Sequence, residues 1–83
     1  MKTLKILNEK EFNKFPKEKV VWYDTITKNG VIFNFVVVYL KNTEYYIEII
    51  EKSVKQYVQV TPLVFLEFSA LVEEFNEEHG KTY

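Results

Sequence analysis

The chain has 83 residues, of which 47% are hydrophobic and 17% aromatic, a composition that excludes a disordered chain and predicts one small domain over 1–83. Its eleven basic residues are all lysines and face twelve acidic ones, so the net charge of -1 disfavours general attraction to nucleic acid or to an anionic membrane. The absence of cysteine excludes disulfides and thiol catalysis, and we expect neither a metal site nor a cofactor.

The sequence predicts neither a targeting signal nor a membrane span. The first residues lack the apolar run of a secretory signal, and no stretch approaches the ~18 apolar residues of a membrane span. We therefore expect an intracellular, cytoplasmic protein. Abundant Lys, Asn, Glu and Ile without Arg is typical of an AT-rich genome, such as that of a virus or mobile element whose proteins act on a host partner.

The N-terminal part predicts two short elements. Residues 3–7 form an optional short strand, and Asn8 and Glu11 have the spacing of a capping box for a short helix that runs through Phe15. Pro16 ends this helix, and a charged loop follows.

The middle of the chain predicts a four-stranded antiparallel β-meander. The strands are expected over 20–27, 31–40, 45–51 and 54–60, because each range is rich in β-branched and aromatic residues. Asn29-Gly30 is a strong signal for a tight hairpin turn, and Asn42-Thr43 and Lys52-Ser53 are predicted to form the next two turns.

One long C-terminal helix is predicted over 62–79. Thr61 can cap its first amides, Pro62 suits the first helical position, and Gly80 can end it. Apolar residues at helical spacing would pack this helix on one face of the sheet, which gives an α+β fold.

The opposite face of the sheet is predicted to be aromatic. In the expected register it carries Trp22, Phe33, Phe35, Tyr39, Tyr46 and Tyr57, together with Lys55. So much apolar surface has to be covered or used. Three interpretations stay open: the N-terminal segment with Leu4, Ile6, Phe12 and Phe15 covers it, another protein or a second copy of the chain binds it, or nucleic acid does.

Two further surfaces are candidates for contacts. The helix flank formed by Leu63, Leu66 and Ala70 is a possible dimer contact, because these residues share one side of the helix. An acidic docking patch is formed by Glu73, Glu74, Glu77 and Glu78. Its charge would suit a basic partner surface.

Catalysis is not predicted. His79 is the only histidine and lies near the expected end of the helix, and Asp24 and Glu48 would be ~12 Å apart, too far for paired acid chemistry. No catalytic residue is therefore assigned. We expect a non-enzymatic protein-interaction module that acts as a homodimer.

The alternative is a single-stranded nucleic-acid binder. Four meandering strands, a C-terminal helix and VQVTPLVFLEF at their junction resemble the transcriptional-coactivator family of single-stranded DNA binders in element order. That resemblance implies dimerisation. The aromatic face itself would supply the stacking platforms for bases, namely Trp22, Phe35, Tyr39, Tyr46 and Tyr57. The scarcity of lysines on this face favours the protein-interaction module.

Overall fold

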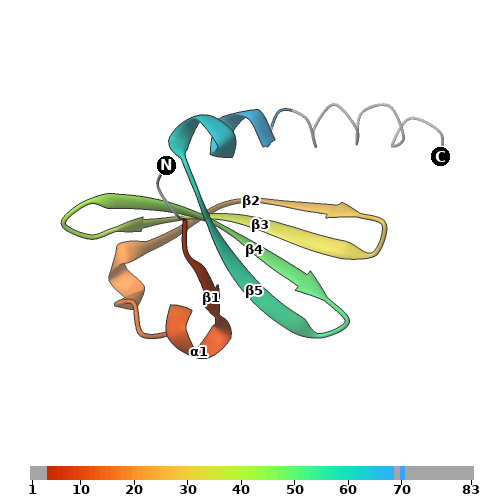
Figure 1. Ribbon diagram of the computed structural model, residues 1–83, viewed down its shortest axis with the longest axis horizontal. Helices are drawn as coiled ribbons and strands as arrows, with labels where there is room; N and C mark the ends of the chain where they lie inside the picture. The colour runs from red at the N-terminus through yellow and green to blue at the C-terminus, as the bar shows by residue number, and fades with distance from the viewer. Residues whose placement is uncertain (1–3, 69, 71–83) are drawn as a thin grey trace.

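The computed structural model describes residues 4–68 and 70, which form a five-stranded antiparallel sheet with helical segments on both sides (Figure 1). In chain order the elements are β1 (Ile6–Asn8), α1 (Glu9–Phe12), the 3-10 helix η1 (Lys17–Lys19), β2 (Val20–Lys28), β3 (Val31–Tyr39), β4 (Thr43–Glu51) and β5 (Val54–Val60). The strands lie in the order β1-β5-β4-β3-β2. The α+β class is confirmed, and the sheet has five strands rather than four because the optional N-terminal strand pairs with β5.

Two of the predicted turns are confirmed. Asn29 and Gly30 join β2 to β3, and Lys52 and Ser53 join β4 to β5. All four residues have positive φ, between 51° and 78°, the left-handed conformation that matches a two-residue hairpin to the twist of its strands. Glycine adopts this conformation without strain at position 30.

The predicted turn at Asn42-Thr43 is wrong. β3 ends at Tyr39, residues 40–42 form a three-residue loop, and Tyr39 lies opposite Thr43. Side chains alternate between the faces of a sheet, so this odd shift in register exchanges the faces of β4 and β5 relative to β3. Phe35 therefore lies opposite Ile47 instead of sharing a face with Tyr46.

A β-bulge in β2 causes a second exchange. The predicted pairing holds at Asp24, which lies opposite Phe35, but the register shifts between Trp22 and Asp24. Tyr23 is the extra residue, and Trp22 consequently lies opposite Val36. Hydrophobic periodicity does not predict such an insertion.

The connection from β1 to β2 crosses one face of the sheet, because these two strands form its opposite edges. α1 begins with the predicted capping box, in which Asn8 Oδ1 accepts from the Glu11 amide at 2.8 Å and Glu11 Oε1 accepts from the Asn8 amide at 3.0 Å. The helix ends at Phe12 rather than at Phe15. Figure 1 shows α1 and η1 on one side of the sheet and the start of the C-terminal helix on the other.

The C-terminal helix begins as predicted. The Val64 amide donates to Thr61 Oγ1 at 3.2 Å, and the Phe65 amide donates to the Thr61 carbonyl at 2.9 Å. Residues 62–68 and 70 are helical. The continuation to His79 and the stop at Gly80 lie outside the described residues, so a long helix is not part of the described structure.

Two apolar clusters hold the layers together, one on each face. The cluster beneath the C-terminal helix contains Ile26, Phe35, Val37, Ile47 and Phe65, and the cluster beneath α1 contains Phe12, Val36, Val38, Tyr46 and Tyr57. The interpretation in which the N-terminal segment covers one face is thus supported through Phe12 and Phe15, whereas Leu4 and Ile6 are exposed.

Candidate functional site

The predicted aromatic face does not exist as one surface. Trp22, Tyr46 and Tyr57 lie on the α1 side, whereas Phe33, Phe35 and Tyr39 lie on the side of the C-terminal helix. Phe35, Tyr46 and Tyr57 are buried, and Phe33 is partly buried. The two predicted rings that stay exposed, Trp22 and Tyr39, are therefore on opposite sides of the sheet.

Lys55 has a local partner. Its Nζ lies 3.4 Å from Glu9 Oε2, so it joins β5 to α1 at the surface. Such an exposed pair contributes at most ~1 kcal/mol. This contact gives Lys55 a role in holding the N-terminal segment against the sheet.

A buried carboxylate lies beneath α1. Glu48 is 6% exposed, and its two oxygens accept from Asn34 Nδ2 at 2.6 Å and from the Tyr57 hydroxyl at 2.5 Å. Thr25 Oγ1 donates in turn to Asn34 Oδ1 at 2.6 Å. Burial, followed by the hydrogen bond to Glu48, raises the pKa of Tyr57. Each of these four side chains has a hydrogen-bond partner, so the arrangement is typical of a buried polar network with a structural role.

The strongest candidate for a binding surface is on the other side of the molecule. We call it the helix-edge surface and define it by Tyr23, Tyr39, Pro62, Leu63 and Leu66. Leu63 and Leu66 are 64% and 67% exposed, and Tyr23 and Tyr39 are 58% and 41% exposed. Ala70, the third residue of the predicted helix flank, is also exposed. None of the five residues that define the surface is charged, and the nearest charged residue on the described part of the helix is the exposed Glu67, one turn after Leu63.

A hollow of ≈ 230 Å³ gives this surface its shape. Tyr23, Tyr39, Tyr45 and Leu66 line it, and the buried ring of Phe65 lies among them, 6.4 Å from Tyr23 and 5.3 Å from Tyr45 between ring centroids. The hydroxyls of Tyr23 and Tyr39 lie 2.8 Å apart. This hydrogen bond is the main cause that raises the pKa of Tyr39, and it fixes the two rings as one wall.

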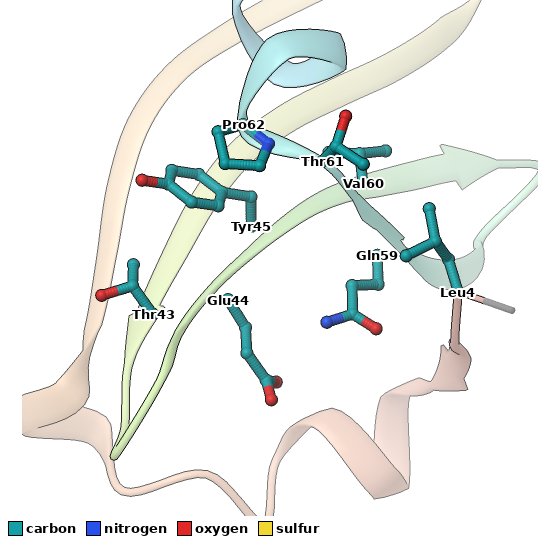
Figure 2. Close-up of a pocket in the computed structure, with 8 residues that line it drawn as sticks. All are labelled: Leu4, Thr43, Glu44, Tyr45, Gln59, Val60, Thr61 and Pro62. Carbon is teal, nitrogen blue, oxygen red and sulfur yellow. The ribbon is translucent and has the colours of Figure 1, made fainter. Parts of the chain in front are cut away.

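A second hollow adjoins the first across Tyr45 and Pro62. It measures ≈ 360 Å³ and is more polar, with Thr43, Glu44 and Gln59 among its lining residues. Figure 2 shows the Tyr45 ring beside Pro62, while the side chains of Glu44 and Gln59 point toward the opposite side. Glu44 Oε1 already accepts from the Tyr46 hydroxyl at 2.7 Å. The apolar hollow is therefore the one suited to an apolar anchor.

The neighbouring sheet edge is shielded against strand pairing. β2 is an outer strand of the described sheet and has nine residues, long enough to pair with another strand. The Asp24 carboxylate, however, accepts from the Thr25 amide at 2.8 Å, and the bulge at Tyr23 interrupts the strand. A charged group and a bulge are common devices that prevent edge-to-edge pairing.

Residues 4–68 and 70 contain neither a candidate metal site nor a membrane-spanning helix. No group of three or more His, Cys, Asp or Glu residues there could hold a metal ion. Within the same residues, no helix has the length and apolar character needed to cross a membrane. The predicted acidic patch of Glu73, Glu74, Glu77 and Glu78 and the histidine His79 lie outside the described residues.

Sequence reasoning missed Tyr23. The alternating pattern assigned it to the face opposite Phe35, and only the bulge brings it beside Phe65. Sequence reasoning did name Leu63, Leu66 and Ala70 as a helix flank beyond the stripe that packs on the sheet, and all three are exposed; their role as a dimer contact stays a prediction.

Comparison with protein-family models, curated proteins and solved structures gives no match. The resemblance to the transcriptional-coactivator family therefore stays an expectation drawn from element order.

Proposed function

We propose that the protein is a non-enzymatic interaction module that forms a homodimer through the helix-edge surface. The observation that carries the proposal is the pair Leu63 and Leu66, both about two-thirds exposed on the C-terminal helix, of which Leu66 lines the same hollow as the exposed rings of Tyr23 and Tyr39. Exposed leucines occur singly on most proteins, but a contiguous group around a hollow is typical of an interface.

The size of the surface suits a reversible dimer. An aromatic side chain buries ~150–250 Å² when fully covered, so two half-exposed tyrosines offer roughly 200 Å². Two leucines at about two-thirds exposure add on the order of 100 Å² more. About 300 Å² of apolar area can form the centre of an interface that covers ~800 Å² on each partner.

The absence of charge favours a second copy as the partner. A twofold interface brings the same patch together with itself, so any charged residue at its centre would meet its own kind. The five residues of the helix-edge surface are uncharged, Glu67 lies at its border, and its polar groups, the Tyr23 and Tyr39 hydroxyls, already bond to each other. Two copies can therefore meet without burying an unpaired charge.

Nucleic-acid binding has less support. Stacking of several bases needs exposed rings in a row, whereas Tyr46 and Tyr57 are buried and Trp22 and Tyr39 lie on opposite sides. Leu66, which lines the hollow beside Tyr39, also offers no partner to a phosphate.

The test is the molar mass from light scattering during size-exclusion chromatography, at protein concentrations up to about 1 mM. We expect the wild type to dimerise and Leu66→Glu to be monomeric with unchanged thermal stability. Val54→Glu is the matched control, because Val54 is 63% exposed at the far β4–β5 turn, and it should dimerise normally. A wild type that stays monomeric, or equal loss of dimer in both variants, would refute the proposal.

A further inference from the structure

A third hollow lies on the α1 side of the sheet, away from the helix-edge surface. It measures ≈ 380 Å³ and is lined by Phe12, Asn13, Phe15, Lys17, Val20 and Trp22. Small-molecule sites commonly have this volume and this combination of apolar walls with a few polar groups. The residues that line it come from α1, η1 and β2 and from the loop between α1 and η1. Three separate elements of the fold therefore form the hollow.

The walls of the hollow are aromatic. Trp22 comes from β2 and Phe12 from α1, with ring centroids 6.0 Å apart, and Phe15 meets Phe12 edge-on at 5.3 Å. Phe12 is itself buried against Tyr57, with centroids 4.0 Å apart and rings nearly parallel, so this wall is held in place. Trp22 nevertheless stays 51% exposed, which leaves much of its ring free to stack with a planar group.

The polar part of the hollow is basic. Among the described residues that line it, Lys17 alone is charged, and Asn13 supplies an amide that can donate or accept. The segment from 14 to 19 contains three lysines and one glutamate, so the local charge is positive although the whole chain is slightly acidic. A ligand here would therefore meet both aromatic rings and a cation.

We propose that this hollow binds a small molecule that joins a planar aromatic ring to an anionic group, with the ring against Trp22 and the anion at Lys17. Stacking on an exposed indole provides the apolar contact, and the lysine selects the charge. The hollow shares no lining residue with the hollow of the helix-edge surface, so ligand binding and dimerisation can be tested separately.

The probe is 2-naphthoate, with 2-naphthylmethylammonium as a matched cation of the same ring system. Trp22 is the only tryptophan, so its indole N–H gives a single assignable signal in a ¹H–¹⁵N NMR titration. We expect saturable shifts of this signal and of the Asn13 amides. The anion should bind roughly fivefold more tightly than the cation, the size of a solvent-exposed ion pair.

Lys17→Gln should remove this preference while leaving the fold intact, because Lys17 is exposed on η1. Lys52→Gln is the control, since it removes the same charge at the β4–β5 turn, at the other end of the sheet. The proposal is overturned if the indole signal does not saturate, if anion and cation bind equally to the wild type, or if the shifts cluster at Tyr39 and Leu66.

Discussion

Phe12 is the residue on which the covered side of the sheet depends. It is 4% exposed, stacks on Tyr57 and meets Tyr46 edge-on at 5.8 Å between centroids. Phe12→Ala should lower the free energy of unfolding by about 3–5 kcal/mol, because it removes a buried ring and leaves a cavity. Urea denaturation followed by Trp22 fluorescence measures this loss.

The control for this change lies in the same segment. Ile6 is 64% exposed in β1, so Ile6→Ala should change the free energy of unfolding by less than about 1 kcal/mol. Equal effects of the two substitutions would show that Phe12 has no special place beneath the sheet.

At the scale of the element, β2 combines a long outer edge with a local block to pairing. Asp24→Ala frees the Thr25 amide that Asp24 now caps and removes a charge from the edge. We expect little change in thermal stability but faster aggregation at high concentration, measured by light scattering and thioflavin fluorescence. Glu51→Ala removes the same charge from the end of β4, which lies between two strands, and should not aggregate faster.

At the scale of the whole molecule, two buried tyrosines connect global stability to alkaline pH. Burial, and then hydrogen bonds to Glu44 and Glu48, raise the pKa of Tyr46 and Tyr57 above the ordinary tyrosine value of 10.0. Their contribution to stability is complete below about pH 10, where unfolded tyrosine is still protonated, and is lost as the pH rises further.

Urea unfolding between neutral pH and pH 11 tests this dependence. The wild type should lose stability above about pH 10, whereas a variant with Tyr46→Phe and Tyr57→Phe should follow a flatter curve because neither ring can ionise. Parallel curves for the two proteins would contradict the assignment of the alkaline loss to these residues.

The sequence predicted the elements better than their faces. Asn29-Gly30 and Lys52-Ser53 have the residues that tight turns require, so both hairpins could be placed. Nothing in Leu40 to Thr43 distinguishes a three-residue loop from a two-residue turn, and Tyr23 has no mark of a bulge. Since each odd shift exchanges faces, two small errors were enough to divide the predicted aromatic face.

The candidate site was predictable only in part. Helical spacing identifies Leu63 and Leu66 as residues beyond the buried stripe, whatever the register of the sheet. Tyr23, Tyr39 and Phe65 come together through tertiary packing, and their meeting depends on the bulge. A site that combines a helix with a bulged strand thus cannot be predicted from the sequence alone.

The pairing of β1 with β5 determines the order in which the two sides can be completed. The hairpins of β2 to β5 need only neighbouring residues, whereas the backbone contact that joins Lys5 to Gln59 spans 54 positions. Closing so long a loop costs entropy that local hairpins avoid, so the crossing segment should dock after the meander has formed. During that interval Tyr46 and Tyr57 should be exposed on the face that the crossing segment later covers. The intermediate that chaperones can bind, or that can misassemble, should therefore persist until β5 has formed, because β1 pairs with β5 in the described sheet.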